Sequence, residues 1–264
     1  MKTALISQIS AFFIVGLCTF VSINSCKASS DEVISSQDKP LQDIKVLVFT
    51  KTDGYEHRSI PAGVAALKKL GQENGFEVTE TQWAHYFQPD TLEKYDVVIF
   101  LSTTRDVLNN GEQEAFKAYI NSGGGFVGIH AAADTEYEWA WYGQLVGAYF
   151  KSHPKQQNAL VKVTDKNHPS TAHLPSEWER WDEWYNYKDI QPNLNVLAYL
   201  DESTYEGGEN GDNHPIAWYH DFDGGRAFYT GLGHTDESFQ DPLFLQHVLG
   251  GIIYAAGAEK FEGK

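Results

Sequence analysis

Short apolar runs separated by amphipathic segments dominate the first half of the chain. The runs 44–50, 76–81, 95–101 and 126–129 have the length and the β-branched and aromatic content of buried strands. Segments 60–73 and 111–121 place apolar residues on one face, and Pro61 and Asn110 mark their helical starts. This alternation predicts a parallel sheet that helices cover on both faces, with 44–50 as a central strand.

The pattern is looser beyond residue 134. It predicts helices over 139–146 and 242–256, and strands over 159–164 and 196–200. Runs 216–220 and 226–230 predict a hairpin around Asp223-Gly224-Gly225. The loop 202–213, rich in glycine and acidic residues, is long enough to form a lid. No internal repeat or further domain boundary follows residue 44, so we expect one α/β domain.

The first 25 residues do not belong to this domain. Lys2 precedes an apolar run, 11–21, that is too short for a stable transmembrane helix. The run leads to Ile23-Asn24-Ser25-Cys26, which resembles a bacterial lipobox with Cys26 as the lipidated residue. Plain signal-peptide cleavage is the alternative. The segment predicts an exported, membrane-anchored lipoprotein that faces the periplasm or the cell surface.

Cysteine usage agrees with this prediction. Cys18 lies in the removable segment, so Cys26 is the only cysteine of the expected mature chain. An internal disulfide and thiol catalysis within the domain are therefore excluded. Residues 26–43 are polar and aperiodic and predict a tether, the domain is expected over 44–257, and 258–264 form a tail.

Composition narrows the classes of partner. A net charge of −16 without a basic stripe argues against nucleic acid and against an anionic membrane face. Membrane contact is expected only through the lipid on Cys26, and homo-oligomer formation is left open. Seven Trp and 14 Tyr offer platforms on which sugar rings could stack, although most such rings fill cores.

The stretch 123–134 carries the most informative motif. Gly123-x-Gly125-x-x-Gly128 matches the letters of a dinucleotide fingerprint, but its glycines precede the strand, so a nucleotide site is rejected. His130 follows the strand at a sharp turn like a nucleophile elbow, at the edge where open α/β sheets bind ligands. A histidine that only caps a helix is the alternative interpretation.

Four other polar segments follow predicted strands or fill loops: 55–58, 152–154, 181–185 and 231–236. The first and fourth strands can be neighbours in a parallel sheet, so His57 and His130 are expected to face one pocket. His234 lies on a glycine-flanked turn after a strand and is the natural third member.

Together these segments resemble the ThuA-like (trehalose utilisation) family. The resemblance covers roughly residues 44–257 and depends on Gly54-Tyr55-Glu56-His57, the stretch 125–130 with Asp134, His153-Pro154, Asp182-Glu183 and the closing stretch 225–234. It implies a flavodoxin-like three-layer sandwich with a mostly parallel central sheet, similar to class I glutamine amidotransferases. Those enzymes carry a cysteine where this chain has His130, so amidotransferase chemistry is not expected. The resemblance also implies a link to disaccharide or glycoside catabolism.

The leading hypothesis is an enzyme, a lyase, isomerase or hydrolase, that acts on a disaccharide or an oxidised (keto) sugar. Carbons beside a carbonyl are acidic enough for a side-chain base to remove a proton, and histidine suits that task. The expected catalytic residues are His57, His130, His234 and Glu183, with Asp134 orienting a histidine or capping the helix. The expected substrate-binding residues are Tyr55, Trp139, His153, Trp184 and Asp236.

Two alternatives stay open. His57, His130, Glu183 and His234 would also make a plausible divalent metal site, although no close ligand spacing supports it. A non-catalytic, surface-anchored carbohydrate-binding lipoprotein fits the aromatic content and the tether equally well. The sequence gives little support to a Ser-His-Asp hydrolase, because no Gly-x-Ser-x-Gly motif stands at the turn.

Overall fold

A computed structural model describes residues 40–258 of the chain. The predicted signal peptide, Cys26, nearly all of the tether and the last six residues of the tail lie outside the described residues. A 3-10 turn, η1 (Leu41–Asp43), buries Leu41 in the core, three residues before the expected start of the domain. Within 40–258, no helix combines the length and apolarity that crossing a membrane requires.

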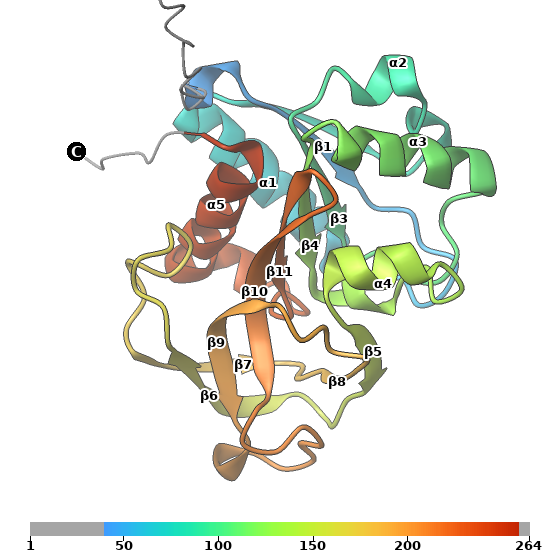
Figure 1. Ribbon diagram of the computed structural model, residues 1–264. Helices are drawn as coiled ribbons and strands as arrows, with labels where there is room; N and C mark the ends of the chain where they lie inside the picture. Colours follow the sequence, from blue (N-terminus) through green and yellow to red (C-terminus); the bar gives the residue numbers. More distant parts are fainter. Residues whose placement is uncertain (1–39, 259–264) are drawn as a thin grey trace, which may run out of the picture. The chain divides into compact units, whose positions relative to one another are not determined.

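A nine-stranded mixed sheet forms the centre of the domain (Figure 1). Neighbouring strands β2, β1, β3, β4 and β11 run parallel, and the sheet continues through β10, β9, β6 and β7 with antiparallel pairs. In this order their bounds are Glu77–Thr81, Lys45–Phe49, Val97–Leu101, Gly125–Ile129, Gly225–Thr230, Pro215–Phe222, Asn195–Asp201, Gln157–Val163 and Glu177–Asp182. β1 is therefore not central, and β3 separates it from β4, contrary to the prediction.

Helices cover both faces of the parallel strands. α1 (Ile60–Asn74) and α5 (Pro242–Ala256) lie on one side, and α3 (Asn110–Asn121) and α4 (Ala140–Val146) on the other, with the short α2 (Pro89–Leu92) beside α3 (Figure 1). The predicted flavodoxin-like three-layer sandwich with a mostly parallel central sheet is confirmed.

Local sequence explains where the helices begin and end. Asn109 caps α3 in a reciprocal capping box with Glu112, one residue before the predicted cap. Pro61 lies in the first turn of α1, which ends at Gly75 in the left-handed conformation at φ +86°. The Asp241 side chain caps α5 by accepting a hydrogen bond from the backbone N–H of Leu243.

Three strands of the second half were not predicted. The edge strand β7 buries Arg180 and Asp182 at positions where an apolar residue would signal a half-buried strand. β5 (Tyr149–Ser152) and β8 (Asn186–Lys188) are short and form a separate two-stranded sheet. The predicted hairpin between β10 and β11 is present, and Asp223 and Gly224 both adopt positive φ in its turn.

The loop 202–213, considered as a lid, is tied to neighbouring strands. Asn210 exchanges two hydrogen bonds with the backbone of Tyr187, at 2.8 and 2.9 Å. Gln157 exchanges two more with the backbone of Glu206. The Glu202 carboxylate lies 2.7 Å from His214 Nδ1 and accepts the backbone N–H of Asn210. These contacts fix the loop in place instead of leaving a free flap.

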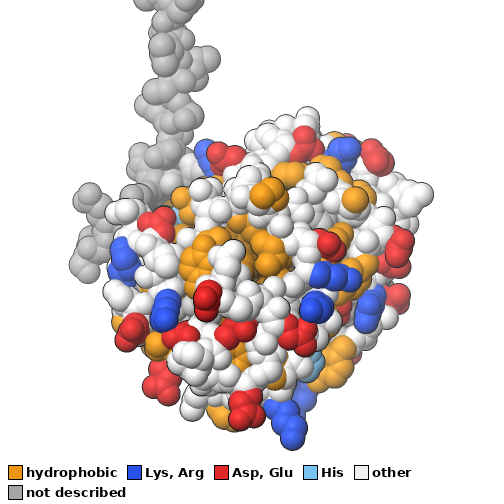
Figure 2. Space-filling view, turned by 60° about the horizontal axis from the view of Figure 1, so that its bottom comes forward, with side chains coloured by type: hydrophobic (Ala, Val, Ile, Leu, Met, Phe, Trp, Pro, Cys, Tyr) orange, Lys and Arg blue, Asp and Glu red, His pale blue; other side chains and the backbone are white. Residues whose placement is uncertain are grey.

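The surface gives no sign of a polyanion-binding face in the view of Figure 2. Basic and acidic side chains intermingle around a hydrophobic patch, without a continuous basic area. A stripe of basic side chains is the usual electrostatic footprint of a nucleic-acid-binding protein.

Candidate functional site

His130 occupies a strained turn directly after β4. Its φ of +50° lies in the left-handed region, which a non-glycine residue adopts rarely, and its side chain is fully buried. The chain then forms a 3-10 turn, η3 (His130–Asp134), in place of the expected α-helix. This turn presents the imidazole at the carboxyl edge of the parallel strands, as the elbow motif predicted.

Three neighbours fix the orientation of His130. Its Nδ1 lies 2.9 Å from the carbonyl oxygen of Gly231, and the Tyr229 hydroxyl donates to the His130 carbonyl at 2.8 Å. The Tyr185 ring packs against the imidazole with a centroid separation of 4.2 Å. A carbonyl can only accept, so Nδ1 carries a proton and Nε2 is the ring atom that faces the other residues of the site.

The three predicted histidines meet. The ring centroids of His57, His130 and His234 are separated by 4.9, 5.0 and 5.1 Å, with the rings nearly perpendicular. His57 reaches His130 across β3, because the loop after β1 hydrogen-bonds to Thr104, which follows β3. His234 arrives on the connection between β11 and α5.

Glu183 completes the group from the other end of the sheet, directly after β7. Its Oε1 lies 3.2 Å from Nδ1 of His234 and 3.7 Å from Nε2 of His130, and its Oε2 lies 3.2 Å from Nδ1 of His153. One donor atom each of His57, His130, Glu183 and His234 lies within 4.8 Å of the others. We call these four residues the histidine–glutamate cluster.

Asp182 anchors the turn that carries His234. Its fully buried carboxylate accepts the backbone N–H groups of Gly233 and His234, both at 3.0 Å, and the Ser238 hydroxyl at 3.1 Å. Gly233 adopts φ +109°, and a Cβ there would come within 3.1 Å of Ile129. Because Arg180 lies 3.6 Å from the same carboxylate, the buried charge is both paired and hydrogen-bonded.

Burial and mutual contact set the charges of the cluster. Burial, followed by the neighbouring His130 and His234, lowers the pKa of His57 to about 2, so this imidazole is neutral near pH 7. Burial alone would raise the pKa of Glu183, but hydrogen bonds and charges from His130 and His234 outweigh it and hold that pKa well below its usual range. The cluster therefore combines an ionised carboxylate with at least one neutral imidazole.

A polar cavity of about 200 Å³ opens beside the cluster. Six residues line it: Arg58, Gln156, His234, Thr235, Asp236 and Glu237. Tyr55 stands nearby with its ring centroid 4.8 Å from that of His57 and is 62% exposed. Guanidinium, amide and carboxylate groups on the cavity wall suit a ligand rich in hydroxyl groups.

Three predicted site residues lie apart from the cluster. Asp134 accepts a 2.5 Å hydrogen bond from Tyr137, and no hydrogen bond joins it to a histidine among residues 40–258, because η3 carries it away. Trp184 is fully buried and donates to the Gln157 carbonyl. Trp139 stacks on Trp141, which bonds the hairpin turn beside the amino end of β11, opposite His130.

Several residues of the site were not assigned a role from the sequence. Asp182 was part of a noted motif, but its anchoring of the His234 turn depends on a strand that was not predicted. Tyr185 lies two residues beyond Glu183, and only its packing against His130 reveals its place. Arg58 and Gln156 line the cavity from exposed positions with no distinctive sequence signal.

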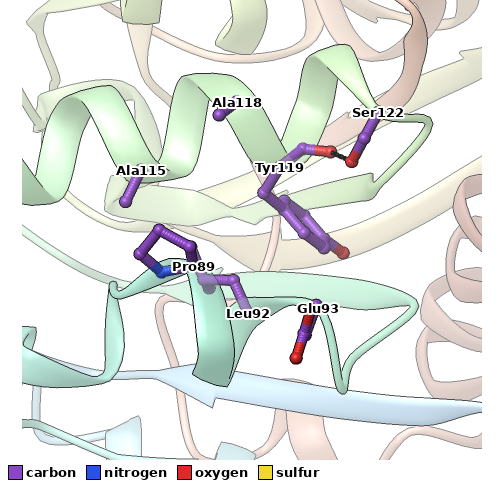
Figure 3. A pocket seen from close by; sticks show the side chains of 7 residues that line it. All are labelled: Pro89, Leu92, Glu93, Ala115, Ala118, Tyr119 and Ser122. Atoms are coloured by element: carbon purple, nitrogen blue, oxygen red, sulfur yellow. Dashed lines mark hydrogen bonds between the residues drawn. The ribbon is translucent and has the colours of Figure 1, made fainter.

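A second pocket, of about 160 Å³, is remote from the cluster. It lies between α2 and α3 and is lined mainly by apolar groups, together with the polar side chains of Glu93, Tyr119 and Ser122 (Figure 3). The Tyr119 hydroxyl donates to Gly125, the first residue of β4, whereas His130 follows the last. Five residues of strand span roughly 16 Å, so this pocket lies at the opposite edge of the sheet.

The protein is a flavodoxin-like sandwich, and the turn after β4 presents His130 to the histidine–glutamate cluster. The family model ThuA, described as trehalose utilisation, matches residues 45–255. The chain belongs to this family, and the predicted resemblance is confirmed. No protein of curated function matches the sequence.

Solved structures agree with this assignment. The chain is similar to a ThuA-like protein of Bacteroides uniformis ATCC 8492, with 26% identity and a TM-score of 0.69 over 80% of this chain and 90% of the other. A ThuA-like protein of Parabacteroides merdae ATCC 43184 shares 21% identity, with a TM-score of 0.70 over 86% and 93%. A β-galactosidase from Bacillus circulans sp. alkalophilus shares the fold at 13% identity, with a TM-score of 0.56 over 83% of this chain and 32% of the enzyme.

Proposed function

We propose that the protein is an enzyme of sugar catabolism that acts on an oxidised (keto) disaccharide or glycoside. The observation that carries this proposal is the histidine–glutamate cluster beside a polar cavity. Of the cluster histidines, His234 lines that cavity, and the ionised Glu183 lies 3.2 Å behind it. The family's description, trehalose utilisation, supports a sugar as the substrate class.

The proposed reaction begins with removal of a proton from the carbon next to the keto group. The proton passes to the cluster, and the C–H electron pair moves toward the carbonyl oxygen to give an enolate. Return of a proton to the neighbouring carbon isomerises the sugar, whereas departure of a β-substituent completes an elimination. Arg58, on the cavity wall, is suitably charged to stabilise the enolate oxygen.

Incubation with trehalose and with its 3-keto form in D₂O, followed by NMR, tests this proposal. We expect the keto sugar to take up deuterium next to its carbonyl and to be converted, while trehalose itself stays unchanged. Sugar binding without exchange or conversion would overturn the proposal and favour the non-catalytic carbohydrate-binding lipoprotein.

Matched variants connect that reaction to the cluster. Glu183→Gln keeps the shape of the side chain and removes its charge, so we expect retained sugar affinity and a turnover that falls about 100-fold or more. Glu179→Gln makes the same change at an exposed position of β7 and serves as the control. Equal turnover in the two variants would separate the cluster from the reaction.

A further inference from the structure

We propose that the histidine–glutamate cluster binds one divalent transition-metal ion, with Zn²⁺ as the type case. The ligands are one ring nitrogen each of His57, His130 and His234 and the Oε1 atom of Glu183. This proposal concerns metal binding and does not depend on the reaction proposed above.

The spacing of the donor atoms fits a common ion. His130 Nε2 and His234 Nδ1 are 3.0 Å apart, and Glu183 Oε1 lies 3.2 and 3.7 Å from His234 Nδ1 and His130 Nε2 respectively. Ligand atoms about 2.1 Å from a tetrahedral zinc are about 3.4 Å from one another. Three of the four donors therefore already stand at metal-site spacing, and the His57 donor lies within 4.8 Å of them.

The hydrogen bonds within the cluster do not satisfy all of its ring nitrogen and carboxylate oxygen atoms. Nδ1 of His130 donates to Gly231, so Nε2 is the ring atom left to bind an ion, and it can do so in the form that carries no proton there. A single proton on His234 Nδ1 can point at His130 or at Glu183, but not fully at both. His57 Nδ1 is buried and has no hydrogen-bond partner within residues 40–258. Buried acceptors without donors are costly, and a cation satisfies several of them together.

Residues around the cluster orient three of the proposed ligands, as the residues that surround metal ligands usually do. The Gly231 carbonyl fixes the tautomer of His130 through Nδ1, which aims Nε2 at the other donors. His153 engages the second oxygen of Glu183 and leaves Oε1 facing the histidines. The Asp182 carboxylate accepts a hydrogen bond from the backbone N–H of His234 and so fixes the position of that residue.

The donor set selects the class of ion. Three imidazole nitrogens and one carboxylate oxygen suit Zn²⁺, Co²⁺, Ni²⁺, Fe²⁺ or Mn²⁺, whereas Ca²⁺ and Mg²⁺ prefer oxygen ligands. Such an ion would supply Lewis-acid polarisation of a substrate carbonyl. Because the cluster lone pairs would then be occupied, proton transfer would fall to His153 or Asp236, which lie beside Glu183 and His234.

Metal titration of the chelator-treated, full-length protein tests the proposal. We expect one Zn²⁺ or Co²⁺ per chain by calorimetry, and a thermal midpoint raised by about 5–10 °C at a hundredfold excess of metal over Kd. Glu183→Gln should weaken binding at least 100-fold, and His153→Ala should weaken it about 10- to 100-fold as an orienting residue. Glu179→Gln should bind metal like the wild type.

Two results would overturn the proposal: no stoichiometric binding of any of the five ions, or binding that Glu183→Gln leaves unchanged. The first would assign the cluster a shared proton in place of a metal, and the second would indicate adventitious surface binding. Circular dichroism of each variant establishes that it is folded. Metal binding without keto-sugar turnover refutes only the proposed reaction, whereas turnover by metal-free protein that binds no ion refutes only the metal site.

Discussion

Two groups of histidines that are buried or half-buried in this domain make different contacts. His173, His220 and His247 each place one ring nitrogen 2.9 to 3.0 Å from a backbone carbonyl, and none of them lies within ion-pair distance of a carboxylate of residues 40–258. His57, His130 and His234 are similarly shielded from solvent, but their rings face one another and Glu183 lies against two of them.

The difference shows that burial of a histidine does not by itself mark a functional site. Burial lowers the pKa of His247 to about 3 and that of His57 to about 2, so the direction of the shift is the same in both groups. What distinguishes the second group is convergence. Its ring nitrogens lie close to one another and to a carboxylate. The ring nitrogens of the first group instead contact backbone carbonyl oxygens of neighbouring elements and connect those elements.

Removing one histidine from each group gives the largest expected contrast. In His130→Asn the cluster loses a donor, and asparagine tolerates the left-handed backbone, so we expect keto-sugar turnover to fall about 100-fold or more. His220→Asn should keep turnover within about threefold while lowering the thermal midpoint. NMR conversion rates and melting curves measure both effects. Similar losses of turnover in the two variants would erase the distinction between the groups.

Asp182→Asn weakens the anchor of the cluster rather than the cluster itself. The carboxylate accepts four hydrogen bonds, from the backbone N–H groups of Glu183, Gly233 and His234 and from the Ser238 hydroxyl. An amide has a single acceptor oxygen and no charge to pair with Arg180, so we expect the free energy of unfolding to fall by about 3 kcal/mol. Denaturant unfolding measures the change. Asp212→Asn, at an exposed position, should change it by less than about 0.5 kcal/mol. If turnover fell while the free energy of unfolding stayed unchanged, Asp182 would position the site without stabilising the fold.

Acid should destabilise the domain through the structural histidines. The pKa of His247 falls from 6.5 to about 3 on folding, because of burial. Its neutral form therefore contributes stability that is full above pH 6.5 and is lost as the pH falls toward 3, by up to about 1.4 kcal/mol per pH unit. In His247→Leu the slope of unfolding free energy between pH 6.5 and 5 should be shallower; an unchanged slope would contradict this role.

The smallest expected effect concerns the exposed ring at the cluster. Tyr55→Ala removes a stacking surface and should raise KM for the sugar about 3- to 10-fold, with kcat and the thermal midpoint nearly unchanged. Trp83 is equally exposed, at 61%, but contacts His85 away from the cluster, so Trp83→Ala is the control. A thermal midpoint that falls with the KM change would show that Tyr55 is structural.

Sequence patterns predicted the parallel half of the fold well, because its strands are continuous apolar runs and its helices are capped by recognisable residues. They missed β7, since Arg180 and Asp182 occupy interior positions that only their mutual contacts make favourable. The three histidines were found because each follows a strand or lies on the loop after one. Trp139, Trp184 and Asp134 lie away from the histidine–glutamate cluster, because a residue type does not reveal which way a short turn or strand end points its side chain.

The place of β7 at the edge of the sheet has a consequence for the lifetime of the site. An edge strand exposes unpaired backbone groups and opens more readily than its neighbours. Opening of β7 would withdraw Glu183 and release the His234 turn together, because adjacent residues perform both tasks. The rate of amide hydrogen exchange in β7 therefore reports the same local unfolding equilibrium that disassembles the histidine–glutamate cluster. A ligand that bridges Glu183 to the histidines should slow that exchange.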